Sequence, residues 1–184
     1  MSSDFDIHID ISGPPADLLS AVERTKSRIA TGRFQRLVIG RGSADAGAVA
    51  SARTLTSLSL IVHPGRPVRS IANETNQPIT SRSEGYSLSI GGDSPSATLT
   101  ANSTLGLLRG LATFEQLWYD LNGTKYLLNG GLDIVDDAAF VGRDASPQVS
   151  KELITSTSPT EVFHSIPPEI CETAYDKGVV ILTK

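Results

Sequence analysis

Hydrophobic and polar residues alternate strictly at the start of the chain. Residues 5–11 place Phe or Ile at every second position, with Asp or His between them. This period of two predicts a strand with one face on a core and the other in water. The Gly-Pro-Pro at 13–15 ends the strand, and apolar residues then recur at helical spacing from Leu18 to Ile29, up to Gly32. The chain therefore begins with a strand and an amphipathic helix.

Short apolar or alternating runs predict the remaining strands. They lie at residues 34–39, 58–62, 86–90, 97–100, 125–128 and 132–135. The linker between the third and fourth of these is rich in Gly, Ser and Pro, so that pair is predicted to form an antiparallel hairpin. The Asn122-Gly123 pair predicts another turn.

A second helix is predicted over residues 104–119, where apolar side chains including Trp118 form one stripe. Asn102, Ser103 or Thr104 could each supply the N-cap. Gly106 and Gly110 lie one turn apart in this helix, although glycine costs about 1 kcal/mol relative to alanine there. Two such glycines indicate that this side of the helix packs closely against another stretch of backbone.

Composition narrows the class of protein. The 184 residues carry a net charge of −4 and are 39% hydrophobic, which suits one globular domain or one domain with an appendage. The acidic balance disfavours nucleic acid as a partner. No run is long and apolar enough to span a bilayer, and the N-terminus lacks the features of a signal peptide. The lone Cys171 excludes an intrachain disulfide.

Three stretches carry a resemblance to a known family. Residues 104–119 read TLGLLRGLATFEQLWY, residues 34–42 read FQRLVIGRG, and residues 84–88 read EGYSL. Together they resemble the small N-terminal domain of family 20 glycoside hydrolases, the β-N-acetylhexosaminidases, and fungal members in particular. The resemblance covers about residues 5–143. It implies an α+β fold, a mostly antiparallel sheet with two helices packed on one face, preceding a (β/α)8 barrel that carries the chemistry.

The resemblance stops at Arg143. Family members continue into the first barrel strand, whereas here residues 144–148 read DASPQ. An eight-stranded barrel needs at least about 200 residues, and only 41 positions follow Arg143. The family's His-x-Gly-Gly-Asp-Glu segment is absent as well. We therefore expect a non-catalytic α+β domain at 1–143 and an irregular C-terminal extension at 144–184, which packs on the domain in place of the barrel.

Few residues offer a site. Arg143 aligns with the family arginine that binds sugar hydroxyls, and it is the one candidate for substrate binding. The adjacent acids Asp136 and Asp137 are interpreted as a solvated turn, because neighbours on an extended segment point apart. The histidines, His8, His63 and His164, lack metal-ligand spacing. We expect no catalytic residue, no metal and no cofactor.

Three Asn-x-Ser/Thr triplets, at Asn73, Asn102 and Asn122, are candidate glycosylation sites. With the family resemblance they favour a secreted, extracellular location, while the missing signal peptide keeps a cytoplasmic one open.

Three functions remain open. The first is a protein-interaction or secreted signalling factor, for example an immunomodulatory one, with an unknown protein partner. The second is weak binding of N-acetylglucosamine or chitin oligosaccharides, and the third is an accessory fragment or subunit of a hexosaminidase. Loss of the barrel would expose an apolar face, so we expect residues 145–184 or a homodimer to cover it.

Overall fold

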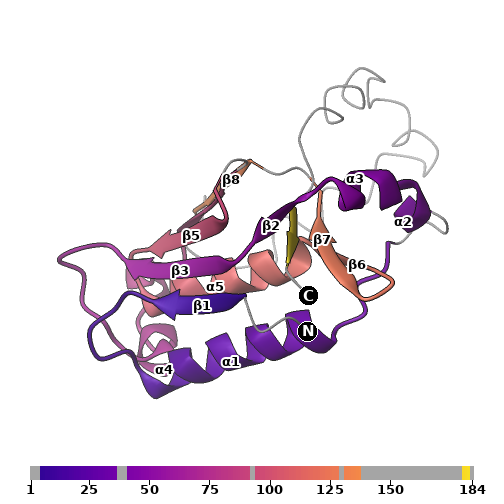
Figure 1. Cartoon of the computed structure of the whole chain (residues 1–184). Helices are drawn as coiled ribbons and strands as arrows, with labels where there is room; N and C mark the ends of the chain where they lie inside the picture. The colour runs from indigo at the N-terminus through magenta and orange to yellow at the C-terminus, as the bar shows by residue number, and fades with distance from the viewer. Residues whose placement is uncertain (1–4, 37–40, 92–93, 129–130, 138–179, 183–184) are drawn as a thin grey trace, which may run out of the picture.

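Nine strands form two sheets in the computed structural model, which describes residues 5–36, 41–91, 94–128, 131–137 and 180–182 (Figure 1). In spatial order, the five-stranded sheet consists of β1 (Asp6–Ile9), β3 (Ser57–Val62), β5 (Ser96–Ala101), β4 (Tyr86–Ile90) and β8 (Leu132–Asp136). The four-stranded sheet consists of β2 (Arg53–Leu55), β9 (Val180–Leu182), β7 (Thr124–Leu127) and β6 (Trp118–Leu121).

Strand directions are mixed. The pairs β1/β3, β3/β5 and β2/β9 are parallel, and the pairs β4/β5, β4/β8, β6/β7 and β7/β9 are antiparallel. The α+β class and the predicted 86–100 hairpin are therefore confirmed. The strands β1 and β3 are parallel because a crossover that includes α1 connects them instead of a hairpin.

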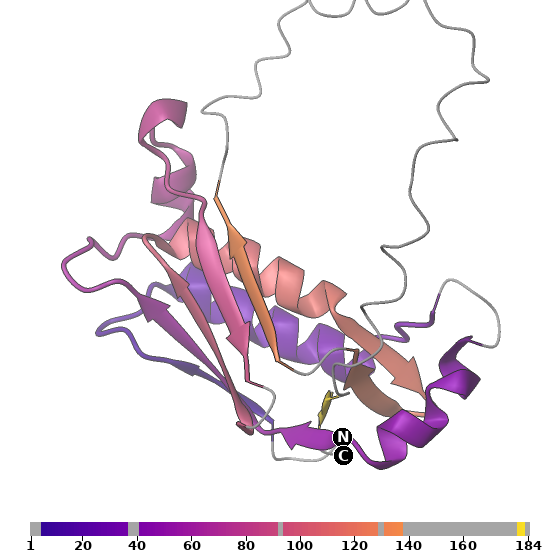
Figure 2. The ribbon, with the colours of Figure 1, turned by 90° about the horizontal axis from the view of Figure 1, so that it is seen from above.

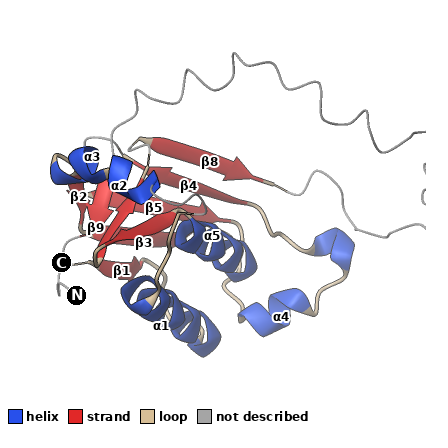
Figure 3. Cartoon of the chain, turned by 90° about the vertical axis from the view of Figure 1, so that its right-hand side faces the viewer, coloured by secondary structure: helices blue, strands red, loops and turns tan. Residues whose placement is uncertain are grey.

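Two long helices, α1 (Ala16–Thr31) and α5 (Thr104–Gln116), lie side by side on one face of the five-stranded sheet (Figure 3). The view from above shows both helices running beneath the strands (Figure 2). Buried side chains from the strands and both helices make one core. Five of them are 0% exposed: Leu18, Leu58, Leu99, Leu107 and Phe114. The predicted two-helix layer is confirmed.

Short helices that the sequence did not predict complete the fold. They are α2 (Arg41–Ala44), α3 (Ala46–Ala50), α4 (Ile71–Thr75) and a 3-10 turn at Ile79–Ser81. Helix α4 contacts both long helices, and its Ala72 amide donates to Asp17 Oδ2 of α1 at 3.0 Å. Such short helices lack the repeated apolar spacing by which longer ones are predicted.

Helix α5 ends earlier than predicted. It begins at the cap Ser103, whose hydroxyl accepts the Gly106 amide at 3.1 Å, and it ends at Gln116, while Trp118 and Tyr119 belong to β6. The Asn122-Gly123 turn, with φ of 51° and 86°, forms a tight hairpin and commits the preceding residues to a strand. Trp118 is 1% exposed, so it belongs to the core although it lies in a strand.

The predicted strand at 34–39 is wrong over residues 34–36, which form an irregular segment; residues 37–39 lie outside the described residues. A single backbone bond connects the segment to the second sheet, since the Asp120 amide donates to the Phe34 carbonyl at 2.8 Å. One such bond does not make a ladder, which explains the missing strand.

One face of the five-stranded sheet lies opposite the two long helices (Figure 3). Side chains alternate between faces along a strand, so the positions opposite the buried leucines share this open face. Its central row runs across the register from His8 through Ser59, Thr98 and Ser89 to Asp133. Among the described residues, the exposed large hydrophobic side chains are Leu19, Val68, Ile79 and Val135.

Candidate functional site: a basic cavity

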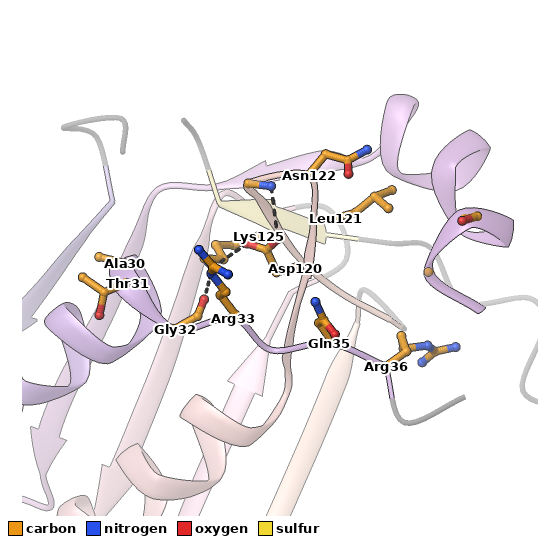
Figure 4. A pocket seen from close by; sticks show the side chains of 13 residues that line it. Ala30, Thr31, Gly32, Arg33, Gln35, Arg36, Asp120, Leu121, Asn122 and Lys125 are labelled. Carbon is orange, nitrogen blue, oxygen red and sulfur yellow. Dashed lines mark hydrogen bonds and ion pairs between the residues drawn. The ribbon is translucent and has the colours of Figure 1, made fainter. Parts of the chain in front are cut away.

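A charged site lies where the end of α1 meets the β6–β7 hairpin. A cavity of about 650 Å³ opens there between the segment 30–36, the hairpin and α2. We name it the basic cavity, because its charged lining residues are the three cations Arg33, Arg36 and Lys125 and the carboxylate Asp120 (Figure 4).

Hairpin geometry places the central ion pair. Asp120 and Lys125 lie opposite each other in the β6–β7 register, and Lys125 Nζ is 2.5 Å from Asp120 Oδ2. The Gly123 amide at the turn donates to the other carboxylate oxygen, Oδ1, at 3.1 Å. Both oxygens of Asp120 are therefore occupied from within the hairpin.

The same pair attaches the hairpin to the end of α1. Lys125 Nζ also donates to the Gly32 carbonyl, and its ammonium lies 5.7 Å from the centre of the Phe34 ring. The Lys125 side chain is only 12% exposed, so a large part of its role is structural. Removing it would leave a carbonyl and a carboxylate without their partner.

The charge of Asp120 is stabilised by its surroundings. Partial burial raises the pKa of this carboxyl, but the bonds from Lys125 and the Gly123 amide and the charge of Arg33 outweigh that effect, and the pKa is lowered overall. A general acid needs a pKa raised toward the working pH. Asp120 is therefore a fixed anion and a poor proton donor.

A second charged group borders the cavity. Arg36 Nε lies 3.4 Å from Asp45 Oδ2, the same oxygen that accepts the Tyr126 hydroxyl at 2.9 Å. The Arg36 guanidinium lies 4.8 Å from the centre of the Tyr119 ring, a cation–π arrangement. Burial, followed by the hydrogen bond to Asp45, raises the pKa of Tyr126 to about 12, so the phenol is neutral at physiological pH.

Arg143, the predicted substrate-binding residue, lies outside the described residues, as do His164 and Cys171. Asp136 and Asp137 are both exposed, at the end of β8 and just after it. Of the predicted site residues that the structure describes, only Asn122, predicted as a glycosylation site, lines the basic cavity.

The three glycosylation triplets differ in their surroundings. Asn73 on α4 and Asn122 at the hairpin tip are exposed, whereas Asn102 is half-buried. The hydroxyl of Thr104, the third residue of the Asn102 triplet, is fully buried and donates to the Arg69 carbonyl at 2.8 Å.

His8 is exposed beside Asp6, with Nδ1 3.6 Å from Asp6 Oδ2, and His63 is exposed in a loop. Within the described part of the chain, no cluster of three or more His, Cys, Asp or Glu side chains could hold a metal ion.

Sequence reasoning missed the residues that make up the basic cavity. One signal was present: a two-residue Asn-Gly turn places Asp120 opposite Lys125, and opposite charges at facing positions stabilise a hairpin. No local pattern marks Arg33 or Arg36, because they reach the cavity only through packing between α1 and the second sheet.

Fold and site together define a small α+β domain. Asp120, the carboxylate that lines the basic cavity, is ion-paired to Lys125. A family model described as beta-acetyl hexosaminidase like matches residues 7–117, more than half of the chain. The chain therefore belongs to this beta-acetyl hexosaminidase-like family, and the resemblance to the N-terminal domain of family 20 glycoside hydrolases is confirmed. At 184 residues it is too short to contain the catalytic barrel.

A solved structure with detectable similarity is the chitobiase of Flavobacterium johnsoniae. The sequences are 19% identical, the TM-score is 0.43, and the match covers 76% of this chain and 18% of the chitobiase. This chain thus spans less than a fifth of that protein. A search of the curated proteins returned no match. Among the described helices, none combines the length and the hydropathy needed to cross a membrane.

Proposed function

We propose that this chain is a non-catalytic interaction module, which acts by binding another protein. The non-catalytic part of the proposal is supported by the state of Asp120, the carboxylate of the basic cavity. It is ion-paired to Lys125 at 2.5 Å with a lowered pKa. Glycoside hydrolysis requires a general acid that stays protonated until it reaches the leaving-group oxygen, and Asp120 is unsuited to that task.

The aromatic side chains argue against binding of neutral sugars. Large flat rings are the usual means of covering an apolar sugar face, but none of the described aromatic residues is exposed. Trp118, Tyr126 and Phe114 are at most 1% exposed. Their rings stabilise the fold and offer no platform for a chitin oligosaccharide.

The open face of the five-stranded sheet is the surface that best suits a protein partner. It is covered by none of the described helices (Figure 3), and its central row is made of small polar side chains. Non-obligate protein interfaces are about as polar as ordinary surface, so a hydroxyl-rich face is compatible with this role.

A second candidate is favoured by the family match over residues 7–117. In this reading the chain is an accessory part that assembles with a hexosaminidase barrel, carried in the same or a separate polypeptide. It predicts that mixing the two parts changes the stability or the activity of the barrel.

The C-terminal segment belongs to the same proposal. We infer that residues 144–184 pack on the domain in place of a barrel, which is supported by the pairing of β9 with β2 and β7. Truncation after Arg143 should then cause aggregation or dimerisation, seen by light scattering. A monomeric truncated chain of unchanged stability would contradict it.

A secreted location is also part of the proposal, supported by the exposed positions of Asn73 and Asn122. Mass spectrometry of protein recovered from a secretory host would reveal glycans at these two positions, and their absence would count against it.

One set of measurements separates the functions. Chitotetraose titrated into the chain should give no saturable heat, and a chromogenic N-acetyl-β-glucosaminide should stay intact. Heat that is lost in Arg143→Ala would instead establish a sugar site. The accessory function predicts a different result when the chain is mixed with a separately produced family 20 barrel that lacks this domain. The mixture should then hydrolyse the substrate faster than the barrel alone.

A further inference from the structure

The basic cavity holds cationic hydrogen-bond donors that the fold itself does not use. Asp120 is saturated, since one oxygen accepts Lys125 Nζ and the other accepts the Gly123 amide. The Arg33 residue is exposed beside this pair, and its side chain makes no ion pair or hydrogen bond with another described residue. Its charge is felt by Asp120 only over distance. A cation without a structural partner is therefore left at the opening.

Arg36 is the second cation with unused hydrogen-bond donors, although its charge is paired with Asp45 and it lies over the Tyr119 ring. Its side chain is 16% exposed, and Nε is buried without a hydrogen bond, because the 3.4 Å approach to Asp45 is an ion pair of poor geometry. A guanidinium offers five N–H donors, and none of them makes a hydrogen bond within the described residues. Buried donors are normally satisfied, so an unsatisfied one calls for an acceptor.

The rest of the lining indicates the kind of molecule that supplies this acceptor. Hydroxyls of Thr31 and Ser43 and amides of Gln35 and Asn122 surround the cations, and no aromatic ring lines the cavity. Such a lining suits a polar ligand. In Figure 4, Arg33 and Arg36 lie on either side of Gln35 along one extended segment, so the cations meet the cavity from separate positions.

We propose that the basic cavity binds a small polar molecule through an oxyanion group, which Arg33 and Arg36 hold with charge-assisted hydrogen bonds. The planar guanidinium fork matches the paired oxygens of phosphate, sulfate and carboxylate groups. Lys125 and Asp120 keep the hairpin in place and contribute the shape of the site. The binding is independent of the protein–protein function proposed above.

The test is calorimetric titration of the full chain with inorganic phosphate, inorganic sulfate and glucuronate, each up to about 20 mM at constant ionic strength, because salt screens such contacts. At least one oxyanion should give a saturable heat, and the tightest one identifies the group. Glucose, which is neutral, should give none.

Two variants locate the site. Arg33→Gln removes an exposed charge with no described partner and should weaken binding by about tenfold. Arg36→Lys keeps the charge beside Asp45 but loses the fork, and should weaken binding to a similar extent. Arg24→Gln, an exposed position on α1 that does not line the cavity, is the charge-matched control and should bind normally.

Thermal unfolding with and without the tightest oxyanion gives a second readout, since a ligand that binds the folded state raises the Tm. The shift should appear in the wild type and in Arg24→Gln and should shrink in Arg33→Gln. Absence of saturable binding for all three anions, or equal weakening in Arg24→Gln, would overturn the proposal.

Discussion

The Thr25 hydroxyl donates a 2.6 Å hydrogen bond to Glu115 Oε1 and so joins α1 to α5. The other carboxylate oxygen of Glu115 accepts Arg28 at 3.1 Å. Thr25 is 2% exposed, and a buried polar group is tolerated only where it has a partner. The helix layer is thus held by one polar bridge in addition to its apolar contacts.

Replacing Thr25 with Val keeps the shape of the side chain and removes the hydroxyl. One carboxylate oxygen of Glu115 then loses its donor, so the free energy of unfolding should fall by about 1–3 kcal/mol. Urea denaturation measures the change. Ser20→Ala, which removes an exposed hydroxyl on the same helix, is the control and should stay within about 0.5 kcal/mol of wild type. Equal effects in both variants would mean that the bridge contributes nothing.

Gly106→Ala should destabilise the protein although alanine favours helices. A Cβ at this position would lie 2.5 Å from the Gly85 carbonyl oxygen and 2.9 Å from the Ala101 Cβ. The backbone oxygen cannot move aside alone, so we expect a loss of about 1–3 kcal/mol, larger than the gain of about 1 kcal/mol in helix propensity.

The matched control for Gly106 is Gly47→Ala in α3, where an added Cβ would meet no atom within 4 Å. It should raise the free energy of unfolding by about 0.4–1 kcal/mol, because the unfolded chain loses freedom. The two glycine variants should therefore change stability in opposite directions in urea denaturation. A gain in Gly106→Ala would refute the close approach of α5 to the Gly85 carbonyl, just before β4.

Tyr126 should make stability depend on alkaline pH. Its ordinary pKa is near 10, and burial and Asp45 raise it to about 12 in the folded protein. The folded state thus keeps a proton that the unfolded state releases above pH 10. The contribution is complete below about pH 10 and is lost as pH rises toward 12.

Tyr126→Phe removes this titration. The free energy of unfolding should fall by about 0.5–1.5 kcal/mol at pH 7, where the bond to Asp45 is lost, and should decline less steeply than that of wild type above about pH 10. Urea denaturation between pH 7 and the alkaline limit tests both effects. Parallel curves for the two proteins would show that Tyr126 does not titrate differently on folding.

Much of the fold was predictable because its signals are local. The alternation at residues 5–11, the helical spacing from Leu18 and the turn residues before β5 each specify an element through its nearest neighbours. The end of α5 was not predictable from its stripe, because Trp118 continues the helical pattern. The Asn122-Gly123 turn, four residues beyond Trp118, decides that Trp118 belongs to a strand instead.

The basic cavity was largely unpredictable for the opposite reason. Arg33 and Arg36 lie in a segment predicted partly as a strand. Only folding brings them near Asp120 and Tyr119 of β6, which lie more than 80 positions away in the sequence. A charge pattern along the chain does not reveal such a cluster. The open face of the sheet shows the reverse, since its serines were visible as the polar half of each alternation.

Ser103 tests the cap of α5. Its hydroxyl accepts the Gly106 amide at 3.1 Å and donates to the Ser83 carbonyl at 2.5 Å, and the residue is 3% exposed. Alanine would leave both backbone groups without a partner, so the free energy of unfolding should fall by about 1–2 kcal/mol. Ser70→Ala removes the corresponding cap of α4, whose single bond to the Asn73 amide is exposed, and should cost less because water replaces it. Hydrogen exchange should locate the loss at the first turn of α5, and an equal cost for both caps would contradict the role assigned to burial.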